Sequence, residues 1–345
     1  MTIALPIAEA GQNQTGASSV NTTTLQTVSF SGNRSISIAP GALAVSDPLN
    51  FPVKTNQIIS ISMYLKDGQA SQYITSHPGS RTTSWISYGD YTQAKNLTDP
   101  STTSIEHWYF LSAIEAWQPR DYHSFAILGD SITDGRGSYV NANLRWTDLL
   151  YNRISGRLPL SVSNQAAGGN RVLRDGLGPS LLSRIERDVL SHPSVRYAMV
   201  FEGVNDIGDA DATVANQTVT GNRLIQAYQQ IITKIHASNV PIFGATITPF
   251  GCANTTLQPY SDPVREQTRL KVNKWIRSNI GKTGGFDGLV DFDAVMRDPK
   301  NQTRLRPDFD SGDCLHPNVE GYRTMADAFP LELFEQFENG VEGFM

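Results

Sequence analysis

The sequence of 345 residues has little cysteine, no long apolar run and no cluster of basic residues. No apolar run approaches the roughly 18 residues of a membrane-spanning helix, so no membrane partner is expected. A formal net charge of −5 without a Lys/Arg cluster argues against a nucleic-acid partner. The chain has no HExxH motif and no Cys/His cluster, so we expect no catalytic metal and no cofactor. Asp206, Asp209 and Asp211 could bind calcium, but we interpret them as a solvated acidic loop.

Charged residues are scarce at the start of the chain, where only three occur among the first fifty residues. Apolar and polar residues alternate at 28–30, 36–38 and 57–65, and turn signals such as SGN, APG and KDG separate these segments. This alternation is typical of half-buried strands. A chain of this length suggests two domains. We predict that residues 1–118 form an antiparallel, jelly-roll-like β-sandwich.

After residue 118 the pattern changes to short apolar strands that alternate with helices. Strands are predicted over 124–128, 160–164, 196–203, 241–247 and 289–292. Helices are predicted over 146–158, 181–190, 221–238, 264–278 and 319–333. This order is typical of a parallel sheet with helices on both faces. We predict an α/β domain over residues 119–345, with its ligands at the carboxyl ends of the strands.

The first of these strands leads directly into GDSITDGRGS (129–138), an acidic turn that carries a serine. A P-loop is excluded because Asp134 and Gly135 stand where its second glycine and its lysine would be. An EF-hand loop is excluded because its third position, which requires an oxygen ligand, is Ile132. Two interpretations remain. One is a turn without chemistry, and the other is a nucleophilic Ser131 beside backbone N–H groups that can stabilise an oxyanion.

Three more segments rich in Gly, Asn or Asp follow later strands: NQAAGGNR (164–171), GVND (203–206) and DCLHPN (313–318). Four such segments at one edge of a sheet are difficult to attribute to turn chemistry alone. Their order and spacing resemble the SGNH/GDSL hydrolase superfamily, serine esterases with a flavodoxin-like sheet. The resemblance covers residues 122–335 and implies a five-stranded parallel sheet in a three-layer domain.

The resemblance implies roles for five residues. Ser131 matches the nucleophile, and Asp313 and His316 match the acid and the base of a catalytic triad. Ser131 also matches the oxyanion hole, together with Gly169 and Asn205. The chemistry of these residue types agrees: a histidine can take the serine proton, a carboxylate three residues earlier can orient the imidazole, and N–H groups can stabilise an oxyanion. For Asn205, the alternative is an ordinary helix cap.

The longer strings GDSITDGRGS, NLRWTDLL, FEGVNDIG and DSGDCLHPNVEGYR look like a narrower branch of arylesterases and acetylxylan-esterase-like enzymes. Members of that branch carry an N-terminal β-rich domain, which suits residues 1–118. The resemblance implies a serine esterase for short acyl esters, with an acetylated polysaccharide or a small aryl ester as its substrate. A lipid acylhydrolase and a non-catalytic, secreted carbohydrate-binding protein remain as alternatives. The sequence leaves the oligomeric state open.

Two features indicate an exported protein. Seven N-x-[ST] sequons occur, at Asn13, Asn21, Asn33, Asn96, Asn216, Asn254 and Asn301. In an exported chain we expect Cys252 and Cys314 to form a disulfide, because both follow strands at one edge of the sheet; two reduced thiols are the alternative. The start, MTIALPIAEA, does not look like a signal peptide. We expect that a signal peptide and the first strands of the β-domain precede Met1.

Overall fold

The computed structural model describes residues 1–8, 11–39, 41–68 and 72–341. The chain divides into two compact units. The first unit consists of residues 1–112 and 140–142, and the second of residues 113–139 and 143–345. The domain boundary predicted after residue 118 lies close to Ser112, where the first segment of the N-terminal unit ends.

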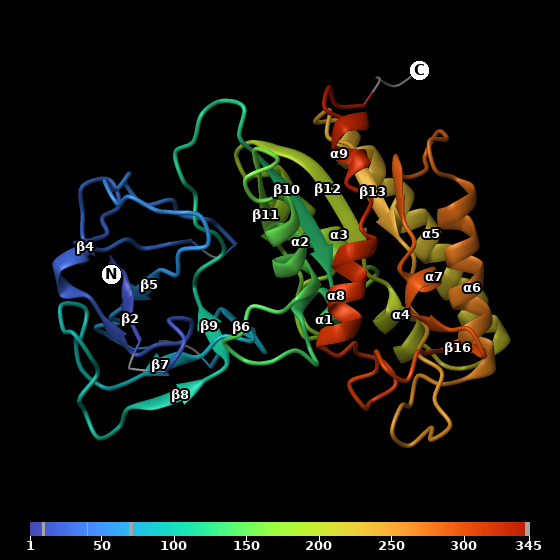
Figure 1. The fold of residues 1–345 in the computed structure, drawn as a ribbon, viewed down its shortest axis with the longest axis horizontal. Coiled ribbons are helices and arrows are strands. Elements are labelled where there is room, and N and C mark those ends of the chain that lie inside the picture. Colours follow the sequence, from blue (N-terminus) through green and yellow to red (C-terminus); the bar gives the residue numbers. More distant parts are fainter. Residues whose placement is uncertain (9–10, 40, 69–71, 342–345) are drawn as a thin grey trace. The chain divides into compact units, whose positions relative to one another are not determined.

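The N-terminal unit is built from short antiparallel strands (Figure 1). These are β1 Thr2–Ala4, β2 Pro6–Ile7, β3 Ser19–Val20, β4 Gln26–Thr27, β5 Ser60–Ser62, β6 Ser76–Pro78, β7 Ser84–Ile86, β8 Thr103–Ile105 and β9 His107–Tyr109, with a 3-10 helix η1 at Thr22–Thr24. Strands β4, β1 and β5 form one sheet in that order, and β2–β3, β6–β9 and β7–β8 form pairs. The expected antiparallel β structure of this unit is therefore confirmed.

The alternation of apolar residues nevertheless overestimates the strands of this unit. Of the predicted segment 57–65, only β5 is a strand, and residues 36–38 belong to none. Ile36 and Ile38 are 47% and 54% exposed. Alternation favours a strand only where the apolar face has something to pack against, and these side chains lie largely in solvent. The expectation of strands before Met1 stays a prediction.

The second unit contains a five-stranded parallel sheet, which confirms the predicted α/β fold. Its strands are β10 His123–Gly129, β11 Leu160–Asn164, β12 Val195–Phe201, β13 Ile242–Ala245 and β14 Gly288–Val290. Their order is β11-β10-β12-β13-β14, and every neighbouring pair is parallel. This is the flavodoxin-like order, in which ligands bind where the chain reverses its direction across the sheet, at the carboxyl ends of β10 and β12.

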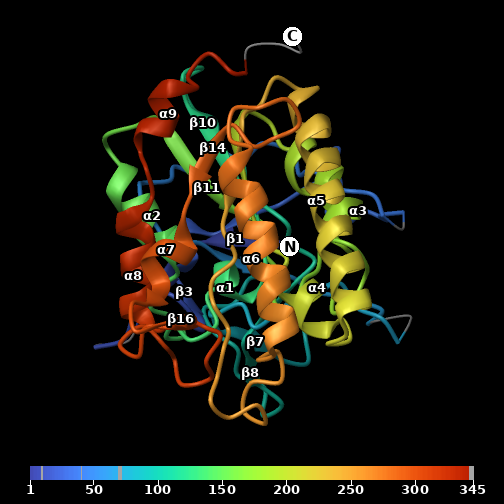
Figure 2. The ribbon, with the colours of Figure 1, turned by 90° about the vertical axis from the view of Figure 1, so that its right-hand side faces the viewer.

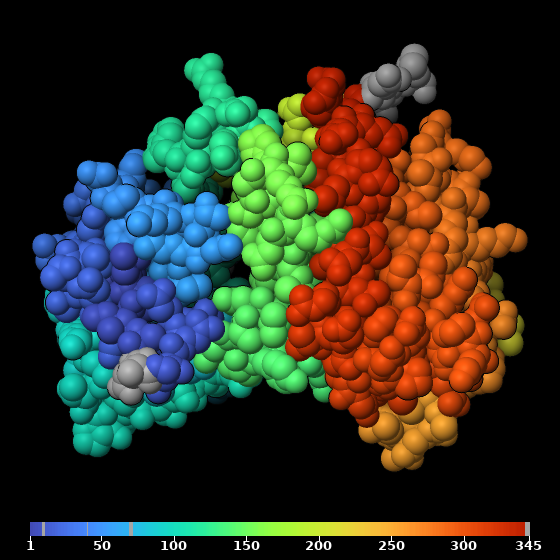
Figure 3. Space-filling model, in the orientation of Figure 1, coloured from blue at the N-terminus to red at the C-terminus, as the bar shows by residue number. Residues whose placement is uncertain are grey.

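Helices cover both faces of this sheet (Figure 2). One face carries α2 Trp146–Ile154, α7 Phe292–Met296, α8 Val319–Ala328 and α9 Glu332–Gln336. The other carries α3 Leu181–Ile185 with its π-helical continuation η2 Glu186–Leu190, α4 Val204–Asp209, α5 Val214–His236 and α6 Pro263–Ser278. Strand β10 alternates between the two cores, since Phe125 and Ile127 pack into the first while Ala126 and Leu128 pack into the second. The space-filling view shows the segments of α8 and α9 lying against the chain around residues 270–305 (Figure 3).

The ends of some elements differ from the prediction for local reasons. Helix α8 ends at Ala328 instead of continuing to residue 333, because Pro330 cannot donate an intrahelical hydrogen bond. Helix α5 starts at Val214, where the Thr213 side chain caps it, seven residues before the predicted start at 221. Helices α1 (Ser131–Asp134), α4 and α7 are too short to show a helical period in the sequence. The hairpin β15 Arg297–Asp298 and β16 Asn301–Leu305 was likewise not predicted. None of the helices in the described ranges combines the length and the apolar character that crossing a membrane requires.

Candidate active site

The residues singled out from the sequence lie in loops and helix starts at the carboxyl ends of the parallel strands. Ser131 begins α1 directly after β10, with Asp130 as the N-cap whose carboxylate accepts the Ile132 N–H at 2.9 Å. Gly169 lies in the loop after β11, and Asn205 lies in the first turn of α4 after β12. The loop between β16 and α8, residues 306–318, carries Asp313 and His316, the candidates for acid and base. We call it the acid–base loop. The sheet edge predicted to carry the ligand site therefore gathers all of these segments.

A serine, a histidine and an aspartate form a continuous hydrogen-bonded chain at this edge. Ser131 Oγ lies 2.8 Å from His316 Nε2, although the two residues are 185 positions apart in the sequence. His316 Nδ1 lies 2.6 Å from Asp313 Oδ2. Ser131 and His316 are 7% and 3% exposed, so bulk water is largely kept from the serine–imidazole contact. The arrangement can transfer the serine proton to the imidazole while a carboxylate stabilises the resulting imidazolium.

The acid–base loop holds the Asp313 carboxylate in a fixed position. Its Oδ1 atom accepts the backbone N–H groups of Leu315 at 3.0 Å and His316 at 2.8 Å. Burial by itself raises the pKa of the Asp313 carboxyl, but the hydrogen bond and charge of His316 together with these backbone donors outweigh it. The net pKa lies well below the ordinary value of an aspartate. Asp313 is therefore a carboxylate whenever the protein is folded near neutral pH.

The N–H groups expected to form an oxyanion hole are available for a ligand. Within the described part of the chain, the backbone N–H groups of Ser131 and Gly169 donate to no other residue. Gly169 has a φ of +71°, a conformation that side chains other than glycine rarely adopt. Asn205 is not the helix cap, because Gly203 is the N-cap of α4. Instead, Asn205 Nδ2 donates to the carbonyl oxygen of Asn170 in the Gly169 loop at 2.9 Å.

A buried arginine connects the carboxyl ends of the first three strands. The Arg184 guanidinium donates to the carbonyl oxygens of Gly129 at 3.3 Å and Gln165 at 2.5 Å, and it pairs with Glu202 at 3.3 Å. Its Nε atom donates to the side-chain oxygen of Asn170. Arg184 is 3% exposed. One side chain thus fixes the loops that carry the serine, the glycine and the asparagine relative to one another.

Three acids are buried beneath these loops. Burial raises the pKa of Asp130 to about 7, of Glu202 to about 8 and of Asp206 to about 6. Asp206 accepts the backbone N–H groups of Val172 at 2.8 Å and Leu173 at 3.0 Å and is 5% exposed. The interpretation of Asp206 as part of a solvated loop is therefore wrong. Its carboxylate fixes the turn that follows the Gly169 loop, whereas Asp209 and Asp211 are exposed.

The sequence did not single out Arg184, Glu202 or Tyr260 as site residues. Arg184 gave a signal that could have been used, because it shares one helical face with Leu181 and Ile185 at core positions of α3. A charged residue on a buried face needs partners. Glu202 gave the same signal, since it is a charged residue that continues an apolar strand. Tyr260 gave none, since it lies in a loop without periodicity.

The expected disulfide joins Cys252 and Cys314, with 5.6 Å between their Cα atoms and 62 positions between them in the sequence. It connects the loop after β13 to the acid–base loop, next to Asp313. Gln258 adds a second link, because its side-chain N–H donates to the Asp313 carbonyl oxygen at 3.1 Å. Both contacts restrict the loop on which the imidazole depends.

The described residues contain no group of three or more His, Cys, Asp or Glu arranged to hold a metal ion.

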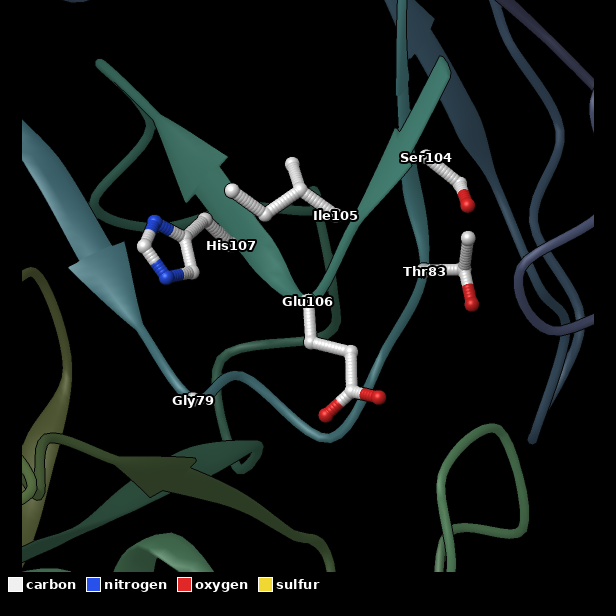
Figure 4. A pocket seen from close by; sticks show the side chains of 6 residues that line it. All are labelled: Gly79, Thr83, Ser104, Ile105, Glu106 and His107. Carbon is white, nitrogen blue, oxygen red and sulfur yellow. The ribbon is translucent and has the colours of Figure 1, made fainter.

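A separate hollow lies within the N-terminal unit, lined by Gly79, Thr83, Ser104, Ile105, Glu106 and His107. Figure 4 shows the side chains of Thr83 and Ser104 on one side of it and those of Ile105 and His107 on the other. Glu106 lies 3.9 Å from Arg81. Among the described residues that line this hollow, no hydrogen bond joins a serine to a histidine, whereas one joins Ser131 to His316.

Residues 125–329 match the family described as GDSL-like lipase/acylhydrolase. No curated protein matches the chain. Among similar solved structures, a variant of an acetyl xylan esterase from Geobacillus stearothermophilus is 20% identical, covers 60% of this chain and 92% of its own, and has a TM-score of 0.42. A carbohydrate acetylesterase family member from Sinorhizobium meliloti is 13% identical, with coverages of 62% and 98% and a TM-score of 0.48. A GDSL-like lipase from Bacteroides thetaiotaomicron is 14% identical, with coverages of 65% and 92% and a TM-score of 0.45.

Proposed function

The chain belongs to the GDSL-like lipase/acylhydrolase family, and from the geometry of its site we propose that it is a serine esterase. From the resemblance of its sequence we propose short-chain acyl esters, acetyl esters above all, as its substrates. The observation that carries the proposal is the 2.8 Å contact between Ser131 Oγ and His316 Nε2. A serine hydroxyl is a poor nucleophile until a base removes its proton, and this contact supplies the base. Asp313, the acid of the proposed triad, supports the imidazole from its other side.

In the first half of the proposed reaction, Ser131 Oγ attacks the ester carbonyl carbon while His316 takes the serine proton. The carbonyl oxygen becomes an oxyanion, which the N–H groups of Ser131, Gly169 and Asn205 stabilise. The tetrahedral intermediate then expels the alcohol, which leaves with the proton from His316. The acyl group remains on Ser131 as an ester.

In the second half, His316 takes a proton from water, and the resulting hydroxide attacks the acyl-enzyme. The tetrahedral intermediate collapses, the carboxylic acid leaves, and His316 returns the proton to Ser131 Oγ. Asp313 stays ionised throughout, since its pKa lies well below the ordinary value, and it stabilises the imidazolium in both halves. The cycle balances without a cofactor, since water is the only co-reactant.

The substrate proposal is an acetylated carbohydrate or an aryl ester. It rests on the resemblance of the strings GDSITDGRGS, NLRWTDLL, FEGVNDIG and DSGDCLHPNVEGYR to arylesterases and acetylxylan-esterase-like enzymes. A lipid acylhydrolase is the second candidate within the same family. Initial rates on acetylated xylan and on p-nitrophenyl acetate, butyrate and octanoate distinguish them. We expect the highest kcat/KM on the acetyl esters, and a maximum on octanoate would favour the lipid substrate.

The variant Ser131→Ala tests the proposed chemistry. Turnover of p-nitrophenyl acetate should fall to the background rate, because only the nucleophilic hydroxyl is lost. Ser180→Ala is a matched control: Ser180 is a buried serine of the same unit, and its hydroxyl contacts Ser183 rather than an imidazole. It should keep wild-type activity. Retention of more than a few per cent of activity in Ser131→Ala would contradict the proposal, and so would inactivity of the wild-type protein on every short ester.

We also propose that the protein is a secreted glycoprotein. None of the seven sequon asparagines is buried, and a disulfide suits an oxidising compartment. Expression through a eukaryotic secretory pathway should yield a protein whose mass falls after treatment with a peptide N-glycosidase. An unchanged mass would mean that none of the seven sequons carries an N-glycan, and it would contradict this proposal.

A further inference from the structure

The Asn205 amide is held in one orientation by two different partners. Its Nδ2 atom lies 2.9 Å from the carbonyl oxygen of Asn170. A backbone carbonyl oxygen can only accept, so the nitrogen of the amide and not its oxygen must lie there. The Oδ1 atom then faces the Tyr260 hydroxyl at 3.2 Å. This leaves the second N–H of Asn205 without an acceptor among the described residues and available to an oxyanion.

The Tyr260 hydroxyl belongs to a short chain of polar contacts. It lies 3.0 Å from Asp209 Oδ1, and Asp209 Oδ2 forms an ion pair with Arg171 at 2.7 Å. Burial, followed by the charge of Asp209, raises the pKa of Tyr260 well above that of an ordinary tyrosine. The hydroxyl therefore keeps its proton at neutral pH, and both Asp209 Oδ1 and Asn205 Oδ1 lie within hydrogen-bond distance to accept it.

Close packing fixes the position of the Tyr260 ring. It contacts Phe250 edge to face, with 6.4 Å between the ring centroids. A Cβ atom on Gly208 would lie 2.3 Å from the ring, so only glycine at that position leaves room for it. The Tyr260 N–H donates to Gln258, which in turn binds the Asp313 carbonyl oxygen. The ring is thus fixed relative to α4 on one side and to the acid–base loop on the other.

We propose that Tyr260 is a positioning residue of the oxyanion hole, whose hydroxyl holds Asn205 Oδ1 so that the free N–H of Asn205 stays directed at the developing oxyanion. The inference rests on the proposed function, since it assigns Tyr260 to the same reaction. Tyr260 lies outside the four segments GDSITDGRGS, NQAAGGNR, GVND and DCLHPN, and the proposed role explains why a loop tyrosine is packed so closely against α4. Tyr260 itself acts through Asn205 and not on the substrate.

The variant Tyr260→Phe tests the role, because it removes the hydroxyl and keeps the ring. We expect kcat on p-nitrophenyl acetate to fall about tenfold, the effect of one lost hydrogen bond, with KM nearly unchanged. In the background of Asn205→Ala the same change should lower kcat by less than about twofold, since the amide that Tyr260 holds is already gone. A matched control is Tyr197→Phe, which loses a buried hydroxyl whose 2.6 Å hydrogen bond goes to the Phe334 carbonyl oxygen. It should keep the wild-type kcat.

Three outcomes would overturn the inference while the proposed function stands. The first is a wild-type kcat in Tyr260→Phe, with Ser131→Ala inactive. The second is an equal fall of kcat with and without the Asn205 amide, which would mean that Tyr260 supports the fold in general. The third, a fall of kcat in Tyr197→Phe as large as in Tyr260→Phe, would have the same meaning. If Ser131→Ala remains active, the proposed function fails, and the role given to Tyr260 fails with it.

Discussion

The Asp313 carboxylate binds His316 twice: Oδ2 lies 2.6 Å from the ring nitrogen Nδ1, and Oδ1 accepts the backbone N–H of the same histidine at 2.8 Å. The ring and the main chain of the histidine are therefore fixed by one side chain. Because Nδ1 must carry the proton in this contact, Nε2 is left with its lone pair toward Ser131.

Replacing Asp313 by Asn should uncouple the imidazole from the serine. The amide can donate to Nδ1, which places the proton of the neutral ring on Nε2, where it can no longer accept the serine proton. We expect kcat to fall by a factor on the order of 10³ to 10⁴. Asp308→Asn, an exposed change in the same loop, should have no such effect. Steady-state rates on p-nitrophenyl acetate check both, and a loss below about tenfold in Asp313→Asn would contradict the proposed triad.

The Gly169 loop offers a second test with a matched neighbour. Gly169→Ala forces a side chain into a φ of +71° and brings its Cβ within 2.5 Å of Leu177. The backbone N–H proposed for the oxyanion must then move, and kcat should fall at least about tenfold. At Gly168 the new Cβ would lie 3.5 Å from its nearest neighbour, an ordinary contact. Gly168→Ala should stay within about twofold of the wild-type protein. Equal rates for the two variants would exclude a role for the conformation of Gly169.

The sequence predicts those elements of the fold and the site whose structure is determined by residues close together in the chain. Strand β11 is observed over 160–164 as predicted, because Leu160 and Val162 alternate with serines in a short segment, which favours a strand. The serine, glycine, asparagine and Asp/His segments could be placed at one sheet edge because parallel strands end there. Helix α8, in contrast, was predicted too long, since periodicity continued past Pro330 into a separate helix.

The supporting contacts could not be predicted, because they join residues far apart in the sequence. Arg184 reaches Gly129 across 55 positions, and Tyr260 reaches Asn205 across 55 positions as well. Such pairs depend on how α3 and the loop after β13 pack in the folded protein. No pattern of neighbouring residues in the sequence predicts that packing. Apolar alternation failed around Ile36 for the opposite reason, since the pattern was present and the packing was not.

Opening the disulfide should affect activity more than stability. Closing a loop of 62 positions stabilises the folded state by about 4 kcal/mol on the chain-entropy estimate. Because Cys314 lies between Asp313 and His316, a shift of about 1 Å there can lower the rate on the order of a hundredfold. We expect the double variant Cys252→Ala, Cys314→Ala to remain folded at 25 °C and to lose most of its kcat. Circular dichroism and rates on the same samples check this. A folded variant with the wild-type kcat would contradict it.

The buried acids predict a pH dependence of stability. Burial raises the pKa of Glu202 to about 8, whereas in the unfolded chain a glutamate titrates near pH 4. Between about pH 5 and pH 8 the folded protein therefore holds a proton that the unfolded chain has released, so the free energy of unfolding falls as the pH rises. Glu202→Gln should make this fall shallower by up to about 1 kcal/mol per pH unit. Denaturant unfolding at several pH values measures it, with the exposed Glu320→Gln as control. Parallel curves for Glu202→Gln and the wild-type protein would contradict the assignment.

Covalent labelling of Ser131 tests the proposed nucleophile and its base in a single experiment. A small fluorophosphonate reacts with serines that an adjacent base has activated, and peptide mass mapping identifies the residue that carries it. We expect one adduct per chain, on Ser131, absent from Ser131→Ala and formed far more slowly in His316→Ala. Labelling of a different serine, or equal labelling of the wild-type protein and Ser131→Ala, would contradict it.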